Sequence, residues 1–261
     1  MVQNPREEMN NKTMNRYQWF VIGICVLLNV IDGFDVLVMA FTASSVSAEW
    51  GLTGSQLGAL LSAGLFGMGA GSLFLAPWAD KIGRRPLILL CLLISGVSMI
   101  AASLVQSATQ LGIMRFITGL GIGGILASSN VIASEYASSR WRSLAVSLQS
   151  TGYAIGATIG GMIAIALISH FGWRSVFLAG GLTTMFMLVV VFFTLPESLD
   201  YLLVKQPKNA LDRINHLCQR IGLTRIQQLP EVVLNTAQSK IGIAKLFTAG
   251  LGLQTILLWV S

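Results

Sequence analysis

Charged residues are scarce in this sequence. Asp, Glu, Lys and Arg together make up 11% of its 261 residues, whereas a soluble domain carries roughly 25%. Hydrophobic residues make up 54%, and the mean hydropathy is +0.71. The composition therefore excludes an ordinary soluble domain and indicates an integral membrane protein.

Cysteine and histidine are also scarce, with three and two residues. The cysteines fall in apolar runs or in a polar segment, and they imply no disulfide framework. No cluster of His, Cys and carboxylates has the spacing of a metal site, and no nucleophile is paired with a base. The glycine-rich run at 119–124 lies inside an apolar stretch, which argues against a nucleotide site. We therefore expect no metal, no cofactor and no enzymatic activity.

Long apolar runs are abundant. Six of them reach the roughly 20 residues that a helix needs to cross a bilayer, namely 19–41, 57–78, 87–105, 111–133, 144–169 and 176–195. A seventh apolar run begins near residue 249 and stops at residue 261, so we expect it to be the truncated start of another helix. The predicted fold class is an all-α integral membrane bundle.

Basic residues are distributed unevenly about the predicted spans. With residues 1–18 in the cytoplasm, every Lys and Arg lies on the inner side except Arg115, within a span, and Arg174, in an outer loop. This pattern follows the positive-inside rule. The net charge of +6 therefore reflects membrane topology, and we expect no nucleic-acid partner.

Four segments follow from these boundaries: a cytoplasmic tail at 1–18, a six-helix membrane domain at 19–195, a cytoplasmic inter-domain loop at 196–248, and the start of helix seven at 249–261. Within the loop, apolar residues recur at helical spacing from Ala210 to Ile221, and Gly222 follows. This spacing predicts an amphipathic helix that lies on the inner membrane face or braces the bundle, or binds a partner.

The segment APWADKIGRR at 76–85 resembles the signature between helices two and three of the major facilitator superfamily, GxxxD(R/K)xG(R/K)(R/K), with Ala76 in place of the first glycine. Positive-inside bias alone explains the basic residues but not Asp80 and Gly83. RFITGLGIGG at 115–124 and PES at 196–198 resemble signatures of helices four and six. The resemblance implies the N-terminal six-helix bundle of this family, built from two inverted three-helix repeats, and a need for a C-terminal six-helix half.

The same resemblance implies an inner gate. Glu135, followed by Arg140 and Arg142, resembles the carboxylate and arginines that pair in this family with the loop of helices two and three in the outward-open state. The expected gate residues are Asp80, Arg84, Arg85, Glu135 and Arg142. Ala157 stands where antiporters of the superfamily have proline, which argues against antiport.

Two aspartates, Asp32 and Asp35, interrupt the first apolar run. They lie one turn apart on one helical face, where a charge costs a few kcal/mol. At 1.5 Å of rise per residue, Asp35 and Arg115 should lie at comparable depth, with Asp32 deeper. The run DGFD at 32–35 and the run FGWR at 171–174 resemble motifs of the aromatic acid:proton symporters. That resemblance implies import of benzoate, hydroxybenzoate or muconate-type acids with protons across the bacterial inner membrane.

The predicted substrate and proton site consists of Asp32, Asp35, Arg115 and Asn29. A carboxylate buried at Asp32 suits reversible protonation. Arg115 would engage a substrate carboxylate bidentately or neutralise Asp35, and an exchange of partners would reconcile these roles. Alternatively, the cluster is a structural ion pair between helices one and four. Asn29, one turn from Asp32, would bind substrate or pack.

Two other functions stay open at this point. The chain could belong to a transporter of neutral sugars or polyols, or it could be a half that does not transport. The expected partners are a small organic acid, protons and membrane lipid.

Overall fold

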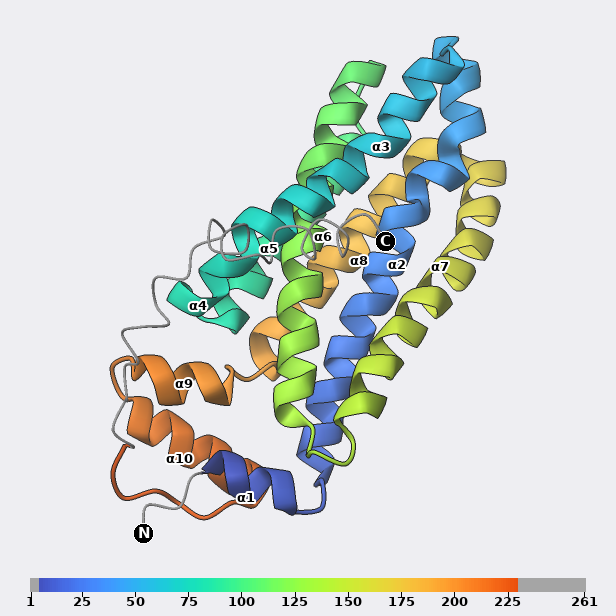
Figure 1. Cartoon of the computed structure of the whole chain (residues 1–261). Helices are drawn as coiled ribbons and strands as arrows, with labels where there is room; N and C mark the ends of the chain where they lie inside the picture. Colours follow the sequence, from blue (N-terminus) through green and yellow to red (C-terminus); the bar gives the residue numbers. More distant parts are fainter. Residues whose placement is uncertain (1–4, 230–261) are drawn as a thin grey trace, which may run out of the picture. The chain divides into compact units, whose positions relative to one another are not determined.

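A computed structural model describes residues 5–229 of the chain, and every regular element in this range is a helix (Figure 1). Six helical stretches are long and apolar enough to cross a membrane. The predicted all-α membrane fold is therefore confirmed. The six stretches are α2 (Arg16–Trp50), a second span over Gly54–Ile82, α5 (Arg84–Ala102), α6 (Ala108–Tyr136), α7 (Arg142–Phe171) and α8 (Trp173–Thr194).

Helix α2 extends beyond its predicted span of 19–41. It starts with a capping box, because the side chains of Asn15 and Gln18 each accept a hydrogen bond from the other's backbone N–H. It continues because residues 42–50 contain no Gly or Pro, and it ends at Gly51, whose backbone is left-handed with φ of 60°. Hydropathy thus locates the membrane segment, whereas the capping residues set the helix ends.

The second span is not a uniform α-helix. Helix α3 (Gly54–Ala70) passes into a π-helical turn, η1 (Gly71–Leu75), then a 3₁₀ turn, η2 (Ala76–Trp78), and finally the short helix α4 (Ala79–Ile82). Pro77 lies within this change, and proline disrupts an α-helix because it lacks an N–H and its ring clashes with an earlier carbonyl. The irregular turns accommodate the proline and deliver the chain to the Gly83 turn before α5.

Glycines bring two pairs of spans to backbone contact. A Cβ at Gly33 of α2 would overlap the Tyr153 carbonyl of α7, and a Cβ at Gly119 of α6 would overlap the Gly64 carbonyl of α3. Small residues permit such close approach of membrane helices. Helix α2 packs along α7, and α6 packs along α3. Helices α2 and α7 are spans one and five, and α3 and α6 are spans two and four. If spans one to three are matched with spans four to six, the first pair corresponds to the second, as two inverted repeats require.

Three shorter helices lie at the end of the bundle where α2 begins (Figure 1): α1 (Pro5–Asn11), α9 (Leu199–Lys205) and α10 (Ala210–Ile221). Helix α10 occupies the stretch where the apolar spacing predicts a helix, and it ends at Gly222 with φ of 80°. We predicted no helix at α1 or α9. Lys12 and Asn15 donate to the carbonyls of Gly222 and Arg220 at 3.0 and 2.8 Å, so the segment before α2 holds α10 in place. The predicted start of helix seven lies outside the described residues.

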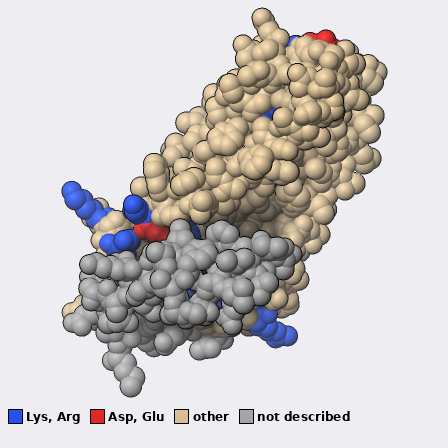
Figure 2. All heavy atoms as spheres, turned by 45° about the horizontal axis from the view of Figure 1, so that its top comes forward, with Lys and Arg blue, Asp and Glu red and all other residues tan. Residues whose placement is uncertain are grey.

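Charged side chains gather toward the two ends of the face shown in Figure 2, and most of the surface between them is uncharged. At the end where α2 finishes, Glu49 forms an ion pair with Arg174 at 2.8 Å and accepts a hydrogen bond from the Trp173 indole at 2.6 Å. The residues of the predicted transport site lie between these ends, in the buried interior of the bundle.

Candidate functional site

Asp32 and Asp35 both point into the interior of the bundle from α2. Their exposed fractions are 2% and 1%. Gly33, between them, is in backbone contact with Tyr153 of α7. Both carboxyl groups are therefore held away from solvent, in surroundings where an unpartnered charge is costly.

One carboxylate oxygen of Asp35 accepts a hydrogen bond, and the other has no hydrogen-bond partner within the described residues. The Thr184 hydroxyl of α8 donates to its Oδ2 at 3.2 Å. Its Oδ1 is buried and has no hydrogen-bond partner among the residues that the structure describes. A Cβ at Gly180, one turn before Thr184, would lie 3.2 Å from that oxygen. Helix α8 thus contributes both the donor and the space for the Asp35 carboxyl.

Arg115 of α6 reaches the same level of α2 as Asp35. Its Nη2 donates to the backbone carbonyl of Asp35 at 2.9 Å and to that of Val36 at 3.4 Å. The predicted match in depth between Arg115 and Asp35 is therefore present. Within residues 5–229, however, Arg115 forms no ion pair with a carboxylate, so direct neutralisation of Asp35 is absent from this conformation.

The remaining donors of Arg115 are unused. Its exposed fraction is 3%, and its Nε and Nη1 have no hydrogen-bond partner within the described part of the chain. The guanidinium lies 6.0 Å from the centroid of the Phe177 ring, on one side. A buried guanidinium with free donors beside an aromatic ring is suited to an anionic group that carries its own apolar ring.

Asp32 and Asn29 differ in the hydrogen bonds that their side chains make. Asp32 makes no hydrogen bond to the described residues, and its Oδ2 is fully buried. Asn29 donates to Gln149 Oε1 of α7 at 2.7 Å and to Ser129 Oγ of α6 at 3.4 Å. Asn29 is thus part of a hydrogen-bond network that joins three helices, whereas Asp32 is outside this network.

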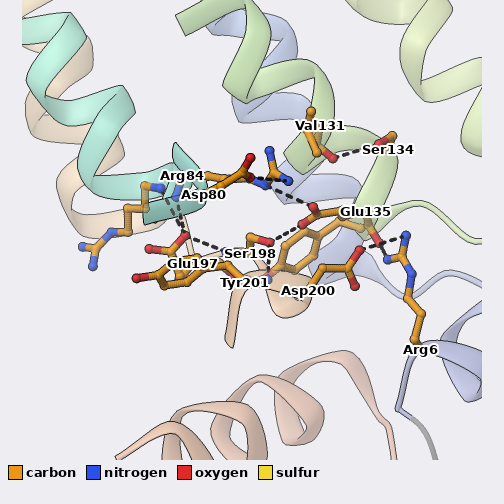
Figure 3. Close-up of polar contacts among 12 residues, drawn as sticks. Arg6, Asp80, Arg84, Val131, Ser134, Glu135, Glu197, Ser198, Asp200 and Tyr201 are labelled. Atoms are coloured by element: carbon orange, nitrogen blue, oxygen red, sulfur yellow. Dashed lines mark hydrogen bonds and ion pairs between the residues drawn. The ribbon is translucent and has the colours of Figure 1, made fainter. Parts of the chain in front are cut away.

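The gate region is organised by a residue that we did not predict, Glu197. Its Oε1 accepts hydrogen bonds from the backbone N–H groups of Arg84 and Arg85 at 2.9 and 3.2 Å, and from Ser198 N–H at 2.9 Å (Figure 3). The first two N–H groups belong to the first turn of α5, where the helix dipole favours an anion. Glu197 therefore ties the segment after α8 to the start of α5.

Glu135, which is buried, and Arg84, which is partly buried, form an ion pair in this region (Figure 3). Arg84 Nε lies 3.1 Å from Glu135 Oε1, and the Ser198 hydroxyl donates to Glu135 Oε2 at 2.5 Å. Arg6 of α1 also donates to the Glu135 carbonyl at 2.5 Å. Residues from α1, α5 and the segment before α9 thus all contact Glu135 of α6, those of α5 and of the segment before α9 at its carboxylate and that of α1 at its backbone carbonyl.

The other predicted gate residues take less part in this cluster. Asp80 is 3.8 Å from Arg84 Nη2 and its side chain is 75% exposed, so this contact is weak. Arg85 turns away and donates to the Phe192 carbonyl of α8 at 2.5 Å. Arg142 donates to Asn10 Oδ1 at 3.1 Å. The structure therefore brings Arg84 and Glu135 together, adds Glu197, Ser198 and Arg6, and places Arg142 against α1.

The Pro-Glu-Ser signal at 196–198 could have identified two of the missed residues. We used it only as a sign of the end of the sixth span. No signal in the sequence indicated Arg6, because its contact depends on where α1 folds back. In residues 5–229 no group of three or more His, Cys, Asp or Glu side chains could hold a metal ion.

Comparison with known proteins relates this arrangement to a family. Residues 24–261 match the model of the Major Facilitator Superfamily. The chain is 36% identical over 258 residues to the 4-hydroxybenzoate transporter PcaK of Acinetobacter baylyi, covering 97% of this chain and 56% of that protein. It is 35% identical over 203 residues to a gallate transporter of Pseudomonas putida, covering 77% of this chain and 45% of that protein. The chain thus spans about half the length of these relatives.

Solved structures show the same fold. The chain is similar to the xylose transporter XylE from E. coli in its inward-open conformation, with a TM-score of 0.67, 17% identity, and coverage of 87% of this chain and 58% of XylE. The match to half of a larger transporter and the six membrane-competent helices identify the N-terminal bundle and a multi-pass membrane protein. The resemblance seen in the sequence motifs is confirmed: the chain belongs to the Major Facilitator Superfamily, and transporters of aromatic acids are among its relatives.

Proposed function

We propose that this chain is the N-terminal six-helix part of a proton-coupled secondary transporter that imports aromatic or related organic acids. Its relatives include proteins named as transporters of 4-hydroxybenzoate, gallate and benzoate. The observation that carries the proposal is the state of Arg115, a buried guanidinium with two nitrogens that are not hydrogen bonded within the described residues. The protein transports its substrate and does not convert it chemically.

Arg115 binds the substrate carboxylate. A buried cation without enough acceptors is costly, and a carboxylate satisfies a guanidinium through two parallel hydrogen bonds. Phe177 lies close to the guanidinium and is fully buried, so it would become a stacking partner for the aromatic ring of the substrate when the bundle opens to admit it. A neutral sugar or polyol would leave the charge of Arg115 without compensation.

Asp32 carries the proton. It is buried, and no residue within 5–229 donates a hydrogen bond to it. It can therefore gain or lose a proton without breaking a hydrogen bond to another side chain. Asp35 accepts a hydrogen bond from Thr184. It lies one turn after Asp32 on α2, at the level where Arg115 of α6 contacts that helix. Protonation of Asp32 and arrival of a substrate anion at Arg115 would together keep the net charge of the interior low, which couples the two events.

The proposed topology is based on the distribution of charge, and the proposed domain boundaries are based on the apolar runs. We propose that residues 1–18 and 196–248 lie in the cytoplasm, that residues 19–195 form the membrane domain, and that residues 249–261 begin helix seven. The support is the concentration of Lys and Arg on one side of the spans. The membrane is the bacterial inner membrane, and transport requires a second six-helix half. The support for this requirement is that the chain covers only 56% of the length of a related transporter.

The inner gate is the cluster of Arg84, Glu135, Glu197 and Ser198, with Asp80, Arg85 and Arg142 at its edge. Its support is the set of contacts that join α5, α6 and the segment after α8. These contacts must be remade when the inner side of the bundle opens or closes against a second half.

The test is uptake by the complete reading frame that contains this chain. Cells that lack aromatic-acid uptake receive labelled benzoate, 4-hydroxybenzoate, muconate or xylose, with and without a protonophore. We expect accumulation of at least one of the acids, loss of that accumulation with the protonophore, and no uptake of xylose. Uptake that ignores the protonophore would refute proton coupling, and uptake of xylose alone would refute the acid substrate.

A further inference from the structure

A cavity of about 570 Å³ lies at the end of the bundle where α8 finishes. Its walls come from the start of α2 at Tyr17, the start of α5 at Arg85, the end of α8 with the segment that follows it, α9 at Leu202, and one side of α10. It is separate from the buried Asp32, Asp35 and Arg115, none of which lines it. Two residues of the proposed gate, Arg85 and Glu197, line the cavity as well.

The α10 wall of the cavity is basic. Arg213, His216 and Arg220 all line it, and their spacing of three and four residues places them on one helical stripe. The Arg220 guanidinium lies 5.5 Å from the centroid of the Tyr17 ring. The Arg213 side chain is exposed and makes no hydrogen bond or ion pair with the described residues.

The acidic residues of the cavity do not balance these cations. Glu197 lines it, but its Oε1 already accepts three backbone N–H groups. Asp212, in the first turn of α10, is the other acid. Three arginines, Arg85, Arg213 and Arg220, therefore line the cavity together with two carboxylates. The arginines are in excess by one charge, and an anion that enters the cavity gains attraction from more than one guanidinium.

The cavity borders the apolar surface of the bundle. Phe192 and Phe193, in the last turn of α8, are 52% and 78% exposed, and Trp19 and Phe20, near the start of α2, are 37% and 51% exposed. Aromatic residues in such positions mark the membrane–water boundary. Exposed apolar side chains continue from there along α5 and α8, at Leu90, Leu93, Val97, Phe186 and Val189.

We propose that this cavity binds the headgroup of an anionic phospholipid from the leaflet that faces this end of the bundle, with the acyl chains against α5 and α8. Basic pockets at the membrane surface favour anionic headgroups, and the adjoining exposed phenylalanines favour a ligand that has an apolar tail. The lipid would contact both α10 and the end of α8, because both elements line the cavity. This inference does not depend on the proposed substrate.

The test is a binding measurement on the delipidated full chain in neutral detergent. The probes are dioctanoyl phosphatidylglycerol, dioctanoyl phosphatidylcholine and inorganic phosphate. We expect phosphatidylglycerol to bind more tightly than the other two. Loss of both arginines in R213Q/R220Q should weaken phosphatidylglycerol binding about 30-fold, since each basic side chain near an anionic surface contributes about 1 kcal/mol, and it should leave phosphatidylcholine binding unchanged.

The matched control is K205Q/K208Q, which removes the same charge from exposed residues that do not line the cavity. An equal loss of phosphatidylglycerol binding in this control would show general electrostatic attraction and overturn the proposal. Equal affinity for phosphatidylcholine, or phosphate binding as tight as phosphatidylglycerol binding, would also overturn it. Phe193→Ser tests the tail contact separately, and should weaken binding of both lipids but not of phosphate.

Discussion

The guanidinium of Arg115 donates to the backbone carbonyl of Asp35, at 2.9 Å, and not to the Asp35 carboxylate. The carboxylate is held from the other side by Thr184 of α8 at 3.2 Å. Helix α6 therefore positions the arginine, and α8 positions the acid, without joining the two charges. This separation leaves donors of Arg115 and one oxygen of Asp35 available for other partners.

Replacing Arg115 should remove recognition of the carboxylate. A charge-assisted hydrogen bond contributes about 1.5–3 kcal/mol. We therefore expect Arg115→Gln to weaken the binding of benzoate-type substrates by a factor of about 10 to 100. Arg115→Lys keeps the charge but loses the planar pair of donors, and should recover only part of the affinity. Competition binding of benzoate and of neutral benzyl alcohol measures this. Equal losses for the two ligands would mean that Arg115 acts only through packing.

Replacing Asp32 should separate coupling from transport. In Asp32→Asn the group no longer binds a proton, so we expect loss of accumulation against a gradient while exchange of labelled for unlabelled substrate persists. Stability should not fall, since Asp32 makes no hydrogen bond within residues 5–229. The control is Asp212→Asn, on the exposed side of α10. Normal accumulation by Asp32→Asn would remove Asp32 from the coupling role.

Removing the Thr184 hydroxyl should release the Asp35 carboxyl. The Thr184 hydroxyl also contacts the Gly180 carbonyl of its own helix at 3.0 Å. Thr184→Val keeps the shape but leaves a buried Asp35 oxygen without its donor, at a cost of about 1–3 kcal/mol in stability. The matched control is Thr183→Val, because the Thr183 hydroxyl bonds only to the Ala179 carbonyl on its own helix. Thermal unfolding in detergent compares the two variants. Equal destabilisation of both would show that the contact to Asp35 adds nothing to the effect of losing a helix-internal hydrogen bond.

A side chain at Gly83 should disrupt the start of α5. Gly83 has φ of 105° and ψ of 154°, and a Cβ there would lie 2.5 Å from Glu197 Oε2. Residues other than glycine are strained in this region by about 1–3 kcal/mol, and displacement of Glu197 adds to that cost. Gly222→Ala is the control, since Gly222 has φ of 80° but no atom within 4 Å of a Cβ. Unfolding temperatures should fall further for Gly83→Ala than for Gly222→Ala.

Acid should weaken the attachment of α1. Glu8 accepts hydrogen bonds from Lys12 Nζ at 2.6 Å and from the Thr224 backbone N–H at 3.1 Å, and the Lys12 hydrogen bond above all holds the pKa of Glu8 below its ordinary value of 4.5. Because the pKa is lower in the folded chain, the contribution of Glu8 to stability is complete above pH 4.5 and is lost as the pH falls through the folded-state pKa.

Comparison of Glu8→Gln with the unsubstituted chain measures this effect. The difference in unfolding temperature between the two should be constant near neutral pH and should shrink as the pH falls below 4.5. A difference that stays constant at all pH values would mean that the ionisation of Glu8 does not support α1.

Features that depend on neighbouring residues were predictable. The six spans and α10 follow from hydropathy and helical spacing. The depth of Arg115 relative to Asp35 was also predictable, because the rise of a helix is constant. Helix ends were less predictable, as α2 shows by continuing from its apolar run to Gly51.

The sequence by itself therefore determined the class of protein, its family and the residues with a charge inside the bundle, since each of these is written in local composition and spacing. Only the tertiary structure decided what those residues contact. The meeting of Glu197 with Arg84, and of Arg115 with a backbone carbonyl of α2, joins residues 113 and 80 positions apart. Such contacts depend on how whole helices pack and which rotamers fit between them, and no short stretch of sequence specifies that.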